Sequence, residues 1–308
     1  MTRVAAVDCG TNSLRLLIAD IDVSERRSVD LQRRTTIVRL GQDVDLTGVF
    51  SDEALARTFA VLDEYAGVID EARPKRLRFV ATSAARDASN RQAFVDGVIA
   101  RMGVEPEIVT GQAEALLSYD GATRGLGERG DVAGALVVAD IGGGSTELVS
   151  RSGICGPIRG RSLDVGSVRL TERHLHHDPP TSGEVDAAVA DIESALDNAR
   201  DSLVDVGTLV GVAGTVTTMA AMVLGLATYD SDRIHLAELP SGELLAAIDE
   251  IVAMTVARRR ALGFMHPGRA DVIGAGALVL AAVVRRAGVG AVVASEHDIL
   301  DGIAWSLI

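Results

Sequence analysis

The residues best suited to chemistry lie in one glycine-rich stretch near the middle of the chain, Asp140-Ile141-Gly142-Gly143-Gly144-Ser145-Thr146-Glu147. Apolar segments precede and follow it, which predicts a turn between two buried strands. Successive backbone N–H groups in such a turn form an anion-binding concavity, and the hydroxyls of Ser145 and Thr146 add donors. The stretch therefore predicts a phosphate-binding loop over residues 142–146.

Asp140 and Glu147 stand at the two ends of this loop. Two carboxylates beside a phosphate site favour a hard divalent cation with oxygen ligands, so we expect Mg²⁺ here, with Mn²⁺ as the alternative. An ordinary glycine-rich hairpin with two solvated acids is the other interpretation of the same residues.

The same order of residues occurs at the start of the chain, where the polar turn is Gly10-Thr11-Asn12-Ser13. At one constant offset, Asp8 corresponds to Asp140, Gly10 to Gly142, and Ser13 to Ser145. Two such units predict a duplicated domain with a ligand between the copies. Arg15 stands where the second copy has Glu147, so one loop offers a cation to a phosphate and the other an anion to a metal.

A third candidate phosphate turn, Gly214-Thr215, follows an apolar segment at 208–212 and starts a helix. Strands and helices alternate along the whole chain, which is typical of an α/β fold. Ser51, Asn90 and Ser182 are the expected helix N-caps. Long helices are expected over 51–73, 90–102, 182–203, 241–260, 267–287 and 298–307.

Composition limits the classes of function. The 308 residues are enough for two domains, and the net charge of −13 argues against a nucleic-acid or membrane-surface binder. Cys9 and Cys155 have neither disulfide nor metal spacing, so a reducing compartment is expected. No leader sequence or long apolar run is visible, and we therefore expect a cytoplasmic protein. The glycine-rich segment 121–134 is the expected domain boundary.

Several blocks of sequence together resemble the exopolyphosphatase/guanosine pentaphosphate phosphohydrolase (Ppx/GppA) family of the actin-like ATPase superfamily. They include Ala81-Thr82-Ser83-Ala84-Ala85-Arg86-Asp87 and Thr110-Gly111-Gln112-Ala113-Glu114-Ala115. The other blocks are residues 8–16, 140–147, 166–172, 212–217, 269–273 and 295–298. Longer members of the family carry a further helical C-terminal region, and the chain resembles the short form, which leaves its grip on long substrates open.

The resemblance implies two ribonuclease-H-like domains with a central cleft between them. The first domain is expected over 1–120 with about 297–308, and the second over 121–296. Glu114 takes the role of general base by this resemblance, and Arg86 lies near the terminal phosphate. Asp140 and Glu147 hold the metal, and Asp8 is a further candidate ligand.

The activity implied is Mg²⁺-dependent release of terminal orthophosphate from inorganic polyphosphate. Three alternatives stay open: hydrolysis of guanosine pentaphosphate, a sensor that binds guanosine penta- or tetraphosphate with weak turnover, and an actin-like ATPase or sugar kinase. The block around Glu114 argues against the last. Substrate chain length, rate and a homodimeric state are not decided by the sequence.

Overall fold

The two loops that begin after Asp8 and Asp140 lie in two separate units of the protein. The computed structural model describes residues 1–126, 134–153 and 156–308. One unit comprises Met1–Gly121 with Ile299–Ile308, and the other comprises Ala122–Asp298. Residues 127–133 of the expected boundary segment, together with Cys155, lie outside the described residues.

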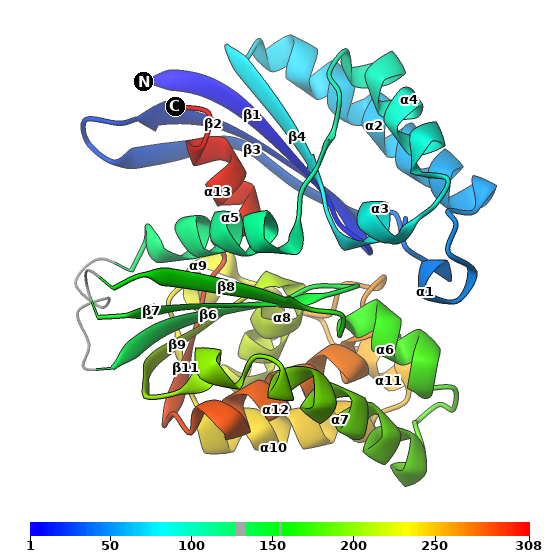
Figure 1. The fold of residues 1–308 in the computed structure, drawn as a ribbon, viewed down its shortest axis with the longest axis vertical. Helices are drawn as coiled ribbons and strands as arrows, with labels where there is room; N and C mark the ends of the chain where they lie inside the picture. The colour runs from blue at the N-terminus through cyan, green and yellow to red at the C-terminus, as the bar shows by residue number, and fades with distance from the viewer. Residues whose placement is uncertain (127–133, 154–155) are drawn as a thin grey trace. The chain divides into compact units, whose positions relative to one another are not determined.

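The first unit is built on a five-stranded sheet (Figure 1). Its strands are β1 (Thr2–Cys9), β2 (Ser13–Asp22), β3 (Arg27–Ile37), β4 (Arg76–Ala81) and β5 (Glu107–Ile108), in the order β3-β2-β1-β4-β5. The β1–β2 and β2–β3 pairs are antiparallel, whereas β1–β4 and β4–β5 are parallel. Its helices are α1 (Val44–Thr47), α2 (Asp52–Ala72), α3 (Ser83–Asp87), α4 (Arg91–Met102), α5 (Gly111–Thr123, which ends in the second unit) and α13 (Ile299–Trp305).

Alternation along β1 supplies both faces of this sheet with apolar side chains. Ala5 and Val7 pack with α2 and α4 residues such as Phe94, whereas Val4 packs with Ile303 of α13. Successive side chains of a strand point to opposite faces, so an apolar run is buried on both sides. Figure 1 shows α2 and α4 together over one face of the sheet and α13 at the other.

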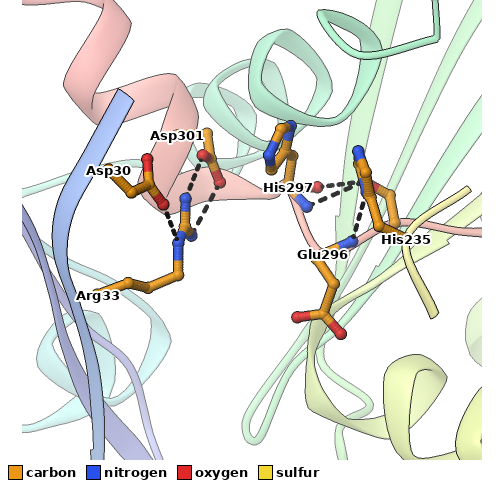
Figure 2. Close-up of polar contacts among 7 residues, drawn as sticks. Asp30, Arg33, His235, Glu296, His297 and Asp301 are labelled. Carbon is orange, nitrogen blue, oxygen red and sulfur yellow. Dashed lines mark hydrogen bonds and ion pairs between the residues drawn. The ribbon is translucent and has the colours of Figure 1, made fainter. Parts of the chain in front are cut away.

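A partly buried ion pair connects α13 to the first sheet. The guanidinium of Arg33 on β3 donates two hydrogen bonds to Asp301 on α13, at 2.5 and 3.2 Å, and a third to Asp30 at 2.7 Å (Figure 2). These two carboxylates raise the pKa of the Arg33 guanidinium against the opposing effect of its burial. The C-terminal helix is thus part of the first unit by charge as well as by apolar packing.

The second unit repeats this arrangement with one strand added. Its strands are β6 (Ala135–Ile141), β7 (Thr146–Ser152), β8 (Ile158–Leu163), β9 (Val206–Val212), β10 (Glu238–Pro240) and β11 (Ala291–Ala294). Its helices are α6 (Ser167–His174), α7 (Ser182–Asp197), α8 (Ala213–Val223), α9 (Ser231–Ile234), α10 (Ser241–Ala253), α11 (Val256–Arg260) and α12 (Ile273–Ala287). A 3₁₀ turn covers Arg200–Leu203.

The order of the second sheet is β10-β11-β9-β6-β7-β8. Without β10 it has the connectivity and strand directions of the first sheet, since β6–β7 and β7–β8 are antiparallel and β6–β9 and β9–β11 are parallel. The predicted α/β class with a duplicated sheet is therefore confirmed, while the cleft between the copies stays a prediction.

Some helix ends differ from the expectation for local reasons. Ser51 caps α2 as predicted, accepting from the N–H of Ala54. Asn90 occupies the N-cap position of α4 as predicted, but its side chain makes no capping hydrogen bond, because its amide bonds both backbone groups of Phe50. The N-cap of α7 is Thr181 rather than Ser182, in a capping box with Glu184.

Three expected helices are also shorter than predicted. The helix expected over 241–260 breaks between α10 and α11, where the side chain of Thr255 starts a new N-cap. The helix expected over 267–287 begins only at Ile273. The helix expected over 182–203 ends at Asp197, ahead of the 3₁₀ turn.

Candidate active site

The predicted site residues of the first unit gather at the carboxyl ends of its parallel strands. The loop Gly10–Ser13 follows β1, Arg86 lies on α3 after β4, and Glu114 lies on α5 after β5. The N–H of Thr82, at the start of α3, donates to the carbonyl of Cys9 at 3.1 Å. Ligands of open α/β sheets bind at this edge of parallel strands, so the topology itself brings these segments together.

The first loop is a tight turn whose carbonyls are already used. Gly10 donates its N–H to Ser13 O at 2.9 Å, while Thr11 O and Asn12 O accept from backbone N–H groups of the segment 38–41. The buried atoms Thr11 Oγ1 and Asn12 Oδ1 have no hydrogen-bond partner in the described part of the chain. Buried polar atoms of this kind are costly unless a ligand or water meets them, which fits a binding loop.

Asp8 and Arg15 face each other across the first hairpin. They are register partners in β1 and β2, and the guanidinium donates to Asp8 Oδ2 at 2.7 and 2.9 Å. Asp8 is 3% exposed. Both hydrogen bonds go to Oδ2 of Asp8, and the role of Asp8 as a further metal ligand stays a prediction. The charge of Arg15 is likewise partly balanced by Asp8.

Arg86 and Glu114 form an ion pair that the sequence analysis did not anticipate. Arg86 Nη1 lies 2.5 Å from Glu114 Oε2 and also donates to Val109 O at 3.1 Å. Glu114 is 7% exposed and sits in the first turn of α5, where the helix dipole favours negative charge. The guanidinium of Arg86 compensates the negative charge of this largely buried carboxylate.

The second loop, Gly142–Thr146, is closed in the same way as the first. Gly142 N donates to Ser145 O at 3.0 Å, and Thr146 Oγ1 donates to Val165 O at 2.6 Å. A Cβ at Gly142 would lie 3.1 Å from Ser145 O, so the turn itself requires a small residue there. Neither Gly10 nor Gly142 has a positive φ, so left-handed backbone is not the reason for glycine at either position. Close approach applies at Gly142 and not at Gly10, because a Cβ at Gly10 would lie 3.5 Å from Ser13 O, an ordinary contact distance.

The two carboxylates expected to hold a metal are neighbours on adjacent strands. Asp140 and Glu147 are register partners in β6 and β7, so their side chains point to the same face of the sheet. They are 6% and 1% exposed, and Ser162 Oγ donates to Glu147 Oε1 at 2.7 Å.

In the described ranges no cluster of three or more His, Cys, Asp or Glu side chains is placed to hold a metal ion. Mg²⁺ usually takes one or two carboxylates together with waters and substrate phosphates, so this donor pair fits that ion.

The third loop lies at the start of α8, beside β9. Ala213 has φ 68°, a left-handed conformation that is unusual for alanine and turns the chain sharply before Gly214. A Cβ at Gly214 would stand 2.4 Å from Cζ of Arg269, so that guanidinium lies directly on the loop. Arg269 was not among the predicted site residues, although its block contributed to the resemblance. A cation touching a loop glycine could have been found only by folding the chain.

A polar cluster follows β11 at the same edge of the second sheet. Tyr229 donates its hydroxyl to Glu296 Oε1 at 2.5 Å. Glu296 N donates to His235 Nδ1 at 3.3 Å (Figure 2). The rings of His235 and His297 lie 4.3 Å apart, centroid to centroid. Burial and the Glu296 carboxylate raise the pKa of Tyr229, so this phenol stays a donor.

The structure also shows the surroundings of Cys9 and of two histidines. Cys9 is 2% exposed, and burial followed by the charge of Asp8 raises the pKa of its thiol well above the usual range, which suits a packing role. His174 contacts Asp191 at 3.0 Å, and His177 contacts Glu184 at 2.8 Å.

Among the helices described, none combines the length and the apolar content needed to cross a bilayer.

Comparison with known proteins identifies the family. The model of the Ppx/GppA phosphatase family matches residues 17–307. The chain belongs to this family. Exopolyphosphatase 2 of Mycobacterium tuberculosis is 47% identical to it in an alignment covering 100% of this chain and 99% of the relative.

Solved structures agree with this assignment to the Ppx/GppA family. The crystal structure of an exopolyphosphatase-like protein is 43% identical and has a TM-score of 0.93, covering 99% of this chain and 97% of the other. The Ppx/GppA family member of Aquifex aeolicus is 31% identical, with a TM-score of 0.82 and coverage of 99% and 97%.

Proposed function

We propose that this protein is an exopolyphosphatase, which hydrolyses the terminal phosphoanhydride of inorganic polyphosphate and releases orthophosphate. The observation that carries the proposal is the buried Glu114 carboxylate, held by Arg86 at the strand edge that also carries the first phosphate loop. The likeness to M. tuberculosis exopolyphosphatase 2, which extends over the whole of both chains, supports the choice of substrate.

The chemistry requires two contributions from the protein. Charge on the transferring phosphoryl group must be neutralised, and a water molecule must be placed in line and relieved of a proton. The backbone N–H groups of the loops 10–13, 142–146 and 213–215, with Arg15 and Arg86, are the donors suited to the first task. Glu114 is the acceptor suited to the second, because a carboxylate can take a proton from water as the bond to phosphorus forms.

Contacts of Thr110, Arg86 and Val109 define the position of Glu114. Thr110 starts α5, accepting at its side chain from Ala113 N at 3.2 Å, and this turn directs the Glu114 side chain toward Arg86. Arg86 is anchored in turn to Val109 O. In this proposal the guanidinium keeps the carboxylate oriented until substrate arrives, and then shares its hydrogen bonds with the terminal phosphate.

Asp140 and Glu147 are the residues that would hold Mg²⁺, or Mn²⁺ as the alternative. The ion would supply neutralisation of phosphate charge. Ser162 keeps one Glu147 oxygen oriented through a 2.7 Å hydrogen bond.

The proposal is tested by a phosphate-release assay on short polyphosphate, long polyphosphate and guanosine pentaphosphate, each with and without Mg²⁺. We expect release from polyphosphate that depends on the metal. Faster release from guanosine pentaphosphate would assign the alternative substrate, since both compounds end in the same phosphoanhydride. Binding of all three without release would contradict the enzyme proposal and favour a sensor.

A further inference from the structure

Three consecutive carbonyl groups of the second phosphate loop, those of residues 142–144, accept hydrogen bonds from residues 167–169. Gly142 O accepts from Ser167 N at 2.9 Å, and Gly143 O accepts from Val168 N and Arg169 N at 2.8 and 3.1 Å. Gly144 O instead accepts from a side chain, Arg169 Nε, at 2.6 Å. The first turn of α6 therefore uses three consecutive carbonyls of the loop.

Holding these carbonyls also fixes the direction of the N–H groups. In a planar trans peptide the C=O and the following N–H point in opposite directions. The N–H groups of Gly143, Gly144 and Ser145 must then point away from α6. Within the described residues, none of these three N–H groups donates a hydrogen bond. They have the arrangement that an anion such as a phosphate group requires.

The orientation of the peptide group between Gly144 and Ser145 depends on one side chain, that of Arg169. Arg169 is 9% exposed, and its Nε is the donor that fixes Gly144 O and hence the N–H of Ser145. Close packing leaves little freedom around this contact. A Cβ at Gly166 would lie 2.5 Å from Gly143 O, and a Cβ at Gly276 of α12 would lie 3.1 Å from Cβ of Ser167.

In the first loop, the corresponding carbonyl group is held by backbone donors and not by a side chain. Asn12, which corresponds to Gly144, has its carbonyl bonded by the backbone N–H groups of Val38 and Arg39 at 3.0 and 2.9 Å. Of these two loops, the second uses a side chain at this position. The hydrogen bond to Gly144 O can therefore be removed by replacing one side chain, whereas the donors to Asn12 O belong to the backbone.

We propose that Arg169 is a positioning residue that aims the N–H of Ser145, together with that of Gly144, at a phosphate group bound in the second loop. This inference rests on the proposed function, because it takes phosphate as the ligand of the loop. In this proposal Arg169 acts through its hydrogen bond to the carbonyl of Gly144, on the side of the peptide opposite the Ser145 N–H.

The test measures binding of inorganic phosphate to the full chain by ¹H–¹⁵N NMR, following the amide signals of Gly143, Gly144 and Ser145, together with kcat and KM on short polyphosphate. Arg169→Met is expected to raise the phosphate Kd and the KM by about tenfold or more, the loss typical of a hydrogen bond to a charged group. Arg169→Lys should recover part of this loss, since an ammonium can still donate to Gly144 O but lacks the fixed fork.

The matched control is Arg286→Met in the same unit. Arg286 lies in the last turn of α12 and donates to Glu193 Oε2, Asp197 Oδ1 and Glu193 O at 2.7, 2.8 and 3.0 Å. None of these groups belongs to the second phosphate loop. This variant is expected to lower thermal stability, because it removes the contacts between α12 and α7. The phosphate Kd should stay within about twofold of the wild type. An equal rise in Kd in both arginine variants would overturn the proposal.

A second variant keeps the idea testable if Arg169→Met does not fold. Gly166→Ala places a methyl group against Gly143 O and should also raise the phosphate Kd. An unchanged Kd in that variant would contradict the proposal. Polyphosphate hydrolysis without phosphate-dependent shifts at these amides would refute the positioning role alone. Arg169-dependent amide shifts in a protein that hydrolyses no polyphosphate would refute the proposed function alone.

Discussion

Arg86 Nη1 and Glu114 Oε2 lie 2.5 Å apart, joining α3 to the first turn of α5 in the first unit. The two residues come from the ends of neighbouring parallel strands, β4 and β5. Their pairing links a residue assigned to phosphate binding with the residue assigned as base. Loss of either side chain therefore changes the environment of the other, and substitutions must keep shape and hydrogen bonding to be interpretable.

Glu114→Gln meets that condition, because an amide oxygen can still accept from Arg86. A glutamine cannot take a proton from water, so kcat should fall by a factor of about 10²–10⁴ while the Kd for polyphosphate stays close to that of the wild type. The control is Glu53→Gln, which changes an exposed acid in the first turn of α2. Steady-state kinetics decide the matter: turnover in Glu114→Gln equal to that of Glu53→Gln would remove Glu114 from the chemistry.

Arg15→Ala tests whether the arginine of the first hairpin serves the substrate or only Asp8. If the guanidinium contacts phosphate, KM should rise by the equivalent of roughly 1.5–3 kcal/mol, the worth of a charge-assisted hydrogen bond. The double variant Asp8→Asn, Arg15→Ala removes the buried charge that the single variant leaves behind. A KM restored to the wild-type value in the double variant would show that Arg15 only compensates Asp8.

Asp140→Asn and Glu147→Gln should each raise the Mg²⁺ concentration needed for half-maximal phosphate release by at least about tenfold, because each removes a charged oxygen ligand. Ser162→Ala should cause a smaller increase, since it only frees one Glu147 oxygen. Asp164→Asn, at an exposed acid after β8, is the control. The measurement is a Mg²⁺ titration of the activity, repeated with Mn²⁺. Identical titration curves for all four variants and the wild type would place the metal elsewhere.

Two helix-interior glycines of the first unit should respond to alanine with opposite signs. A Cβ at Gly67 of α2 meets no atom within 4 Å, so Gly67→Ala should raise the free energy of unfolding by about 0.5–1 kcal/mol through helix propensity. A Cβ at Gly97 of α4 would lie 2.1 Å from the Phe59 ring, so Gly97→Ala should lower it by about 1–3 kcal/mol through overpacking. Urea unfolding of both variants gives the comparison, and a gain of stability in both would show that α4 can move away from Phe59.

Glu184 should make stability depend on acid pH. Its pKa is lowered to about 2, first by the hydrogen bond from His177 and then by that from the backbone of Thr181. A group with a depressed folded-state pKa stabilises the fold above its unfolded-state pKa, near 4.5, and this contribution is lost as the pH falls through about 2. The melting temperature of Glu184→Gln should therefore lie below that of the wild type at pH 6, with the gap closing on acidification. A difference in melting temperature that stays constant from pH 6 down to about pH 2 would show that Glu184 stabilises the fold through the geometry of the capping box and not through its charge.

Much of the fold could be predicted because its signals are local. The two Asp-to-Ser turns, each between apolar segments, predicted hairpins that the structure has at Gly10–Ser13 and Gly142–Thr146. The constant offset between the copies predicted the duplicated sheet. Capping hydrogen bonds were harder to predict where a side chain could bond either its own helix or a distant segment. The side chain of Asn90 bonds the backbone of Phe50 and makes no capping hydrogen bond to its own helix.

The sequence by itself determined which residue types occupy the loops, since glycine, hydroxyl and acidic side chains at fixed spacing act through their own backbone. Tertiary structure alone decided which distant groups meet them. Arg86 and Glu114 are 28 positions apart, and Arg169 lies 25 positions beyond Gly144. Such contacts depend on the parallel pairing of strands and on the packing of α6 behind the loop. These are set by the whole core of each unit, and no local pattern records them.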